Sequence, residues 1–326
     1  MSKVAFITGI SGQDGSYLTE HLLDQGYEVH GIVRRQSTSE NQESRLNHLE
    51  NHDRLHTRYG DLLDPTSLSQ VMIDAKPTHI FNLGAMSHVR VSFDIPQFTI
   101  ETNGIGVLSM LELYRQHCPE AKFYQASSSE MFGNSVDEDG FQRETTPLTP
   151  VSPYGCSKVL GYNLVRHYRN AYNLHACNGI LFNHESPRRG SNFVTSKVVK
   201  TAVQIKLGFV DKLELGNMDS YRDWGHSKDY TRGMIDIINH DVADDFVLST
   251  GETHSVRDLV DVVFSHLDLN WEDYVVQNPK YMRPEELKYL KGDCTKAKET
   301  FGFKLEYTFE SMMHEMVDHW MEVFKR

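Results

Sequence analysis

The first half of the chain alternates short apolar runs with amphipathic helical patterns, and this rhythm constrains the fold more than any other feature. Apolar runs of strand length occur at residues 3–9, 27–34, 54–62, 78–85, 121–129 and 174–183. Helical patterns lie between them, at 15–26, 65–75, 97–117 and 152–172. Because parallel strands need a crossover connection that is usually a helix, this order predicts an α/β protein with a doubly wound parallel sheet.

The alternation stops after about Asn183. The stretch HESPRRGSNF predicts a loop, and the mixed short elements after it are richer in charge, Gly and Pro. We therefore expect a Rossmann domain over residues 1–182 and about 226–250. A smaller C-terminal lobe, which would bind the substrate, is expected over 183–225 and 251–326.

Composition excludes several classes of protein. The chain has 326 residues and a formal net charge of −12, which argues against broad nucleic-acid binding because that usually needs a basic face. The opening MSKVAFITGI has too short an apolar run for a signal peptide, and no stretch approaches the ~18 apolar residues of a membrane span. We expect a cytoplasmic protein with no nucleic-acid or membrane partner.

The cysteines and histidines do not form a recognisable ligand pattern. The four cysteines are far apart, with no CxxC, and the 17 histidines include no HExxH. Reduced thiols and no metal site are therefore expected. The cysteines are Cys118, Cys156, Cys177 and Cys294.

A glycine-rich turn follows the first apolar run. The stretch TGISGQDG places Gly9, Gly12 and Gly15 three residues apart, with Gln13 and Asp14 between the last two. Glycines allow a tight strand-to-helix turn, so that amides at the helix N-terminus can hold a pyrophosphate. The spacing is GxxGxxG rather than GxGxxG, and the alternative is a turn with no ligand. Its place between a strand and a helix favours a dinucleotide site.

Two arginines close the second apolar run and indicate which dinucleotide binds. An NAD site usually carries Asp or Glu about 20 residues past the glycines, whereas this chain has Arg34 and Arg35 there. Guanidinium groups suit a 2′-phosphate, so NADP is predicted. The alternative is that both arginines begin a solvated loop.

The stretch SPYGCSK predicts a catalytic pair. Tyr154 and Lys158 are four residues apart and share one face of a predicted helix. A phenol with a pKa of ~10 is a poor base at neutral pH, but a neighbouring ammonium stabilises the phenolate. Such a pair can take a proton from an alcohol while a hydride leaves its carbon.

These features together resemble the extended short-chain dehydrogenase/reductase family. The stretches TGISGQDGSYL, NHESPRRGSNFVTSKV, LGNMDSYRDWGHSKDY and YMRPEEL look like its GDP-mannose 4,6-dehydratase branch, and the resemblance covers essentially the whole chain. It implies GDP-mannose as substrate and GDP-4-dehydro-6-deoxy-mannose as product, on the way to GDP-fucose or GDP-rhamnose. The alternatives are a sister epimerase or reductase of the same fold, and a non-catalytic NADP-binding protein.

The resemblance implies roles for the residues around YQASSSEMF. Ser128 matches the position that hydrogen-bonds the C4 oxygen, and Glu130 matches the base that removes the C5 proton. An epimerase only oxidises and re-reduces C4, so it needs no such carboxylate. The alternative for Glu130 is an ordinary surface carboxylate after a strand.

Other positions also match the family's sites. For the cofactor, the resemblance adds Asp61, Leu62, Leu83, Ala85, Ser87, His184 and Arg189 to the glycine turn, the two arginines, Tyr154 and Lys158. For the substrate, it implies Ser87, Ser128, Glu130, Asn183, Val194, Lys197, Arg222, Arg283 and Glu286. Taken singly, each basic residue among these would more often be a solvated surface charge.

The chain departs from the family pattern at a few places. Ser196 stands where arginine is usual, Phe98 stands where tyrosine is common, and the segment 133–153 is about two residues longer than expected. None of these positions belongs to the expected catalytic set. The family implies a homodimer or homotetramer, in which the polar segment 34–46 could reach a neighbour's cofactor.

Overall fold

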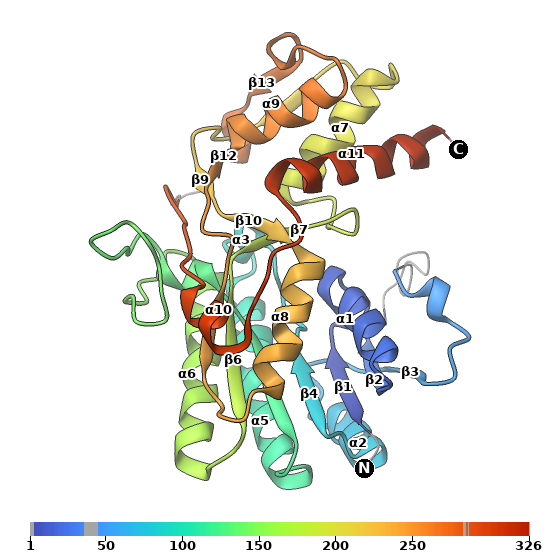
Figure 1. The fold of residues 1–326 in the computed structure, drawn as a ribbon, viewed down its shortest axis with the longest axis vertical. Coiled ribbons are helices and arrows are strands. Elements are labelled where there is room, and N and C mark those ends of the chain that lie inside the picture. The colour runs from blue at the N-terminus through green and yellow to red at the C-terminus, as the bar shows by residue number, and fades with distance from the viewer. Residues whose placement is uncertain (1–2, 36–44, 283–284, 286, 326) are drawn as a thin grey trace.

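A parallel sheet of seven strands, together with the helices on its faces, forms the larger domain of the computed structural model (Figure 1). The structure describes residues 3–35, 45–282, 285 and 287–325. The strand order is β11-β6-β5-β4-β1-β2-β3, and every pairing is parallel. The predicted doubly wound α/β fold is confirmed. The strands are β1 (Val4–Thr8), β2 (Glu28–Val33), β3 (Leu55–Tyr59), β4 (His79–Asn82), β5 (Lys122–Ser128), β6 (Ala176–Leu181) and β11 (Asp245–Leu248).

Helices cover both faces of this sheet because its strands are apolar on both sides. In β1, Ala5 and Ile7 point into one apolar core, whereas Phe6 points into another. The first core contains residues of α1 (Gln13–Asp24) and α8 (Ser227–Asn239), and the second contains residues of α2 (Pro65–Ala75) and α5 (Gly106–His117). The remaining helices near the sheet are α3 (Val89–Ser92), α4 (Pro96–Ile100), α6 (Pro153–Tyr172) and α10 (Thr295–Phe301).

The C-terminal lobe lies beyond the carboxyl ends of the strands and has an apolar core of its own (Figure 1). This core contains Val199, Phe264 and Met312, which come from α7 (Val194–Lys206), α9 (Val256–His266) and α11 (Phe309–Lys325). By contrast, Ala297 and Phe303 pack into the core of the sheet domain. The division into 1–182 plus 226–250 and the remainder stays a prediction.

Short strand pairs connect the segments of the lobe. They are β7 (Asn183–Glu185) with β10 (Trp224–His226), β9 (Tyr221–Arg222) with β12 (His254–Ser255), and β8 (Leu213–Leu215) with β13 (Val275–Gln277). Tight helical turns lie at Asn47–Leu49, Ser129–Phe132, Trp271–Asp273 and Pro279–Tyr281, and a wider one at Glu101–Ile105. Within the described ranges, no helix has both the length and the apolarity to cross a bilayer.

Candidate active site

A cavity of about 700 Å³ lies where the carboxyl ends of the central strands meet the C-terminal lobe. In open α/β sheets this edge is where ligands bind. The cavity brings together most of the predicted site residues, although they come from distant parts of the sequence. Its lining includes Asp14, Leu83, Ala85, Ser87, Ser128, Glu130, Tyr154, Lys158, Asn183, His184, Arg189, Val194, Lys197 and Arg222.

Ser128 and Glu130 lie at the point where β5 ends and a tight helical turn begins. The Ser128 Oγ accepts a hydrogen bond from the Glu130 N–H at 3.2 Å, which caps this turn. Glu130 is only 6% exposed, so it is not a surface carboxylate. A Cβ on Gly155 would lie 2.8 Å from the Glu130 carbonyl oxygen. The glycine in SPYGCSK therefore lets this turn approach the start of α6.

Tyr154 and Lys158 lie on one face at the start of α6, as predicted. The Lys158 Nζ is 5.7 Å from the centre of the Tyr154 ring and donates a hydrogen bond to the Ala126 carbonyl of β5 at 2.8 Å. Burial lowers the pKa of Lys158 to about 8. Burial raises the pKa of Tyr154 to about 12, although a hydrogen bond with Ser128 opposes this shift. Burial therefore disfavours the ammonium form of Lys158 and the phenolate form of Tyr154. Each charged form would stabilise the other.

The glycine turn has the close backbone approach that a dinucleotide site needs. Gly9 has φ of 71°, and a Cβ there would lie 2.9 Å from the backbone of Gly84. A Cβ on Gly15 would lie 2.3 Å from the Gly9 carbonyl oxygen. Only glycine fits at these two positions, so the amides at the start of α1 remain open to a phosphate.

The predicted ribose and adenine positions follow the strands beside this turn. Arg34 and Arg35 are exposed just after β2, and Asp61 and Leu62 come after β3. Because β1, β2 and β3 are neighbours in the sheet, these residues and the glycine turn lie along one edge. This arrangement of glycines and helix N-terminus fits the pyrophosphate of a dinucleotide.

Two residues of the glycine turn use their side chains to bind the protein itself. Asp14 accepts hydrogen bonds from His184 Nε2 at 2.8 Å and from Ser227 at 2.6 Å. Gln13 donates to the His184 carbonyl at 3.1 Å and accepts from Ser186 at 2.8 Å. Although burial acts in the opposite direction, the His184 contact holds the pKa of Asp14 well below its usual range. This network fixes the lobe segment 183–186 to the start of α1.

Several of the predicted substrate residues are side chains of the lobe. The Asn183 Oδ1 is buried and has no hydrogen-bond partner among the described residues. The Lys197 Nζ lies 3.5 Å from the centre of the Tyr281 ring, and the buried Arg222 donates to the Leu287 carbonyl at 3.0 Å. Two other predicted substrate residues, Arg283 and Glu286, lie outside the described residues.

The structure also adds residues that the sequence analysis did not single out. Glu185 is buried in the cavity wall, pairs with the Arg189 Nε at 2.9 Å and accepts a hydrogen bond from Thr195. Asn103 holds the Met86 backbone through bonds of 2.8 and 3.0 Å, which fixes the cavity-lining segment 83–87. Glu185 is the one acidic residue in the stretch NHESPRRG, and this position among predicted site residues could have indicated its role. For Asn103 there was no such indication, because its role depends on a distant backbone segment.

The sequence has close relatives in one enzyme family. It matches the family model of GDP-mannose 4,6 dehydratase over residues 6–316. GDP-mannose 4,6 dehydratase 1 of Arabidopsis thaliana is 47% identical over 334 residues, which cover 99% of this chain and 91% of the plant protein. GDP-mannose 4,6 dehydratase of Homo sapiens is 45% identical over 349 residues, covering 99% of this chain and 92% of the human protein.

Solved structures with the same fold are more distant in sequence. The dTDP-glucose 4,6-dehydratase of Bacillus anthracis, in complex with NAD, has a TM-score of 0.86 at 22% identity, covering 99% of this chain and 98% of that chain. RMD of Pseudomonas aeruginosa, complexed with NADPH, has a TM-score of 0.81 at 20% identity, covering 98% of this chain and 100% of that chain. At this level of identity the likeness concerns the fold.

Proposed function

The chain belongs to the GDP-mannose 4,6-dehydratase family, and from this premise we propose how its own side chains carry out the reaction. The enzyme is a hydro-lyase that converts GDP-mannose into GDP-4-dehydro-6-deoxy-mannose and water. The reaction oxidises C4 and reduces C6 of the same sugar, so there is no net oxidation. GDP-fucose or GDP-rhamnose would be made from this product.

The enzyme uses a nicotinamide cofactor, and we propose NADP in preference to NAD. When bound, the cofactor supplies hydride chemistry, accepting a hydride from C4 of the mannose and returning it to C6. Support comes from Arg34 and Arg35, which stand at the end of β2 where an NAD site would usually carry a carboxylate. The glycine turn would hold the pyrophosphate, and the segment 83–87 would line the nicotinamide end. Asp61 and Leu62 would contact the adenine, and His184 and Arg189 would lie near the cofactor.

In the first proposed step, Tyr154 takes the proton from the O4 hydroxyl. Ser128 hydrogen-bonds the same oxygen, which places it beside the phenol. The Lys158 ammonium stabilises the phenolate, and its bond to the Ala126 carbonyl keeps it beside the ring. Since burial raises the pKa of Tyr154 to about 12, this cation is required for the phenol to act as a base near neutral pH.

In the second proposed step, Glu130 removes the proton from C5. The 4-keto group formed in the first step makes this proton acidic. The C5–H electrons form the C5–C6 double bond, the C6–O bond breaks, and Glu130 gives its proton to the leaving hydroxyl to form water. Glu130 then takes a proton from solvent and adds it to C5 when C6 is reduced, which restores the carboxylate.

The lobe would hold the GDP group. Lys197 and Arg222 supply positive charge for the diphosphate, and the buried Asn183 Oδ1 offers an acceptor to a ligand hydroxyl or N–H. We also propose substrate contacts for Val194 and Ser87, and for Arg283 and Glu286 outside the described residues. A homodimer or homotetramer in the cytoplasm remains our expectation.

The observation that carries the residue assignments is the burial of Glu130 beside Ser128 and Tyr154 in one cavity. Glu130→Gln keeps the shape of the side chain but removes its ability to take a proton. We expect NADP affinity to stay unchanged and formation of the 4-keto-6-deoxy product to fall by at least about a hundredfold. The exposed Glu138→Gln is the matched control and should keep full activity.

Product analysis separates the alternatives. Incubation of the wild type with GDP-mannose and NADP⁺ should give the 4-keto-6-deoxy product with no net change in NADPH absorbance. In deuterated water, the product should carry deuterium at C5. A sister reductase would instead consume NADPH in proportion to product, and an epimerase would release no water. Wild-type rates in the Glu130→Gln variant would contradict the proposed base.

A further inference from the structure

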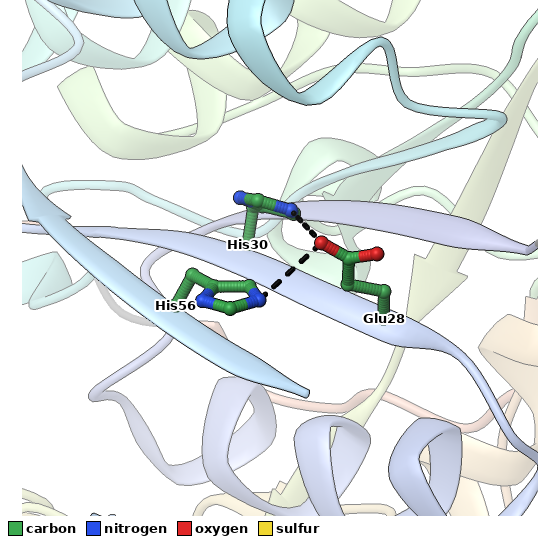
Figure 2. Close-up of side chains that lie close together, drawn as sticks. All are labelled: Glu28, His30 and His56. Carbon is green, nitrogen blue, oxygen red and sulfur yellow. Dashed lines mark hydrogen bonds and ion pairs between the residues drawn. The ribbon is translucent and has the colours of Figure 1, made fainter. Parts of the chain in front are cut away.

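A second cluster of titratable side chains lies on strands β2 and β3, near the ends of these strands that are opposite the cavity. Glu28 and His30 are two residues apart on β2, so their side chains point to the same face of the sheet. His56 of β3 stands directly opposite His30 in the parallel register, which brings it to that face as well. Figure 2 shows the two imidazole rings next to each other, each with one nitrogen directed at the same carboxylate oxygen of Glu28.

One oxygen atom of Glu28 contacts one nitrogen atom of each histidine. The Glu28 Oε1 is 3.0 Å from the His30 Nε2 and 3.3 Å from the His56 Nε2 (Figure 2). All three ligand atoms lie within 4.8 Å of one another. Around a tetrahedral ion with bonds of ~2.0–2.1 Å, ligand atoms are separated by about 3.3 Å. Two of the separations therefore already match such a site, and the third needs at most a small side-chain rotation.

The chemistry of the donors suits a transition metal. Imidazole nitrogens favour Zn, Cu and Ni, and two of them with one carboxylate form a frequent three-residue zinc set. The Nδ1 of His30 is buried and has no hydrogen-bond partner among the described residues, so this imidazole is held at its Nε2 end. The nearby Arg58 is itself paired with Asp74 at 2.5 Å, which reduces its repulsion of a cation.

The cluster is also accessible to an ion from solution. The Glu28 and His56 side chains are each 42% exposed, whereas that of His30 is only 11% exposed. A bound ion would thus have protein ligands on one side and water on the other. Because β3 is the edge strand of the sheet, an ion held here would join it to β2.

We propose that Glu28, His30 and His56 form a binding site for one Zn²⁺ ion, separate from the catalytic cavity. The ion takes the two Nε2 atoms and the Glu28 carboxylate as ligands and completes its shell with water. It stabilises the pairing of β2 and β3, the strands that lead to Arg34, Arg35, Asp61 and Leu62 at their other ends. None of the three residues lines the catalytic cavity, so the ion stabilises this pair of strands and takes no part in turnover.

The direct test is titration of the untagged, metal-free chain with Zn²⁺ in a calorimeter, with Co²⁺ as a spectroscopic probe of the same site. The wild type should bind one ion per chain, and Zn²⁺ should raise its melting temperature. Loss of a neighbouring second-sphere group typically weakens a metal site about 10- to 100-fold, so His56→Gln should weaken Zn²⁺ binding by at least about a hundredfold. His30→Gln should do the same.

The matched control is His48→Gln. His48 also contacts a carboxylate, with its Nε2 2.6 Å from Glu20, but among the described residues no group of three ligand atoms forms there. Zn²⁺ affinity should be unchanged in this variant, and turnover of GDP-mannose by His56→Gln should stay at the wild-type level. The proposal is overturned if the wild type binds no Zn²⁺, or if His56→Gln and His30→Gln bind it as tightly as His48→Gln does.

Discussion

Different kinds of contact stabilise the interior of the sheet domain and the interior of the C-terminal lobe. In the sheet domain, two apolar cores lie on the faces of strands whose order follows from consecutive crossovers. The lobe has one apolar core. Buried polar side chains there also bind segments that are distant in the sequence. Asp223 is the clearest case, because it accepts hydrogen bonds from Thr250, Gly251 and Gly292. Removal of a polar group from the catalytic or cofactor set of the sheet domain should therefore lower activity or cofactor affinity, whereas removal of Asp223 should lower stability.

The largest effect is expected for Tyr154→Phe, which removes only the phenolic oxygen from the sheet domain. Turnover of GDP-mannose should fall by about 10²- to 10⁴-fold because the O4 proton loses its acceptor. The free energy of unfolding in urea should change by less than about 1 kcal/mol, since the ring still fills its site. Substantial turnover would show that another group takes the proton.

The lobe should respond in the opposite way. Asp223→Ala leaves the N–H groups of Thr250, Gly251 and Gly292 without an acceptor in the protein interior, at about 2 kcal/mol each. This outweighs the relief of the burial that raises the pKa of Asp223 to about 6, which is worth about 3 kcal/mol, so the free energy of unfolding should fall by about 3 kcal/mol. Asp219→Ala is the matched control, because the side chain of Asp219 is 71% exposed and pairs with Arg257 at the surface. Its change should stay within about 0.5 kcal/mol. If both variants lost the same free energy of unfolding, buried polar contacts would not be what stabilises the lobe.

Lys158→Met tests a case in which catalysis and stability conflict. Burial lowers the pKa of Lys158 from 10.5 to about 8, which at ~1.36 kcal/mol per unit is a cost of about 3 kcal/mol to the folded state. The lost bond to the Ala126 carbonyl offsets about 1 kcal/mol. With NADP present, the variant should have no activity. Without cofactor at pH 7, its free energy of unfolding should be about 2 kcal/mol higher than that of the wild type.

The sign of the pH dependence checks the cause. Because the folded pKa lies below the unfolded one, the cost is fully present below pH 8 and disappears as the pH rises towards 10.5. The wild type should therefore gain stability relative to Lys158→Met over this range. A constant difference would mean that packing, not charge, separates the two proteins.

The smallest effect is expected for the double variant Arg34→Ala and Arg35→Ala. Both side chains are exposed, so the contact with a 2′-phosphate is screened by solvent. NADP affinity should fall about tenfold, which corresponds to ~1.4 kcal/mol, and NAD affinity should not change. Arg115→Ala, on the exposed face of α5, is the control. Equal losses for both cofactors would contradict the NADP preference.

Much of the sheet domain could be predicted because its signals are local. The apolar runs predicted its first six strands, and the spacing of Gly9, Gly12 and Gly15 predicted the turn into α1. The separation of Tyr154 and Lys158 predicted that they share a helix face. Each of these inferences depends on residues fewer than about ten positions apart, where backbone geometry alone relates them.

The contacts between segments could not be predicted in this way. The Gln13 and Asp14 side chains bind His184, Ser186 and Ser227, although the sequence analysis assigned both residues to the cofactor. Glu185 and Asn103 have their roles through partners that another segment supplies. Spacing alone likewise gave no sign that His30 and His56 are neighbours.

The sequence by itself therefore determined the class of sheet, the glycine turn and the Tyr154–Lys158 pair, because local periodicity and backbone sterics suffice for these. Only the tertiary structure decided that Glu130 is buried beside Tyr154, that Asp223 binds the segments at residues 250–251 and 292, and that Glu28, His30 and His56 converge. The physical reason is that these contacts depend on strand order, register and the close approach allowed at Gly155. Those are properties of the packed chain as a whole.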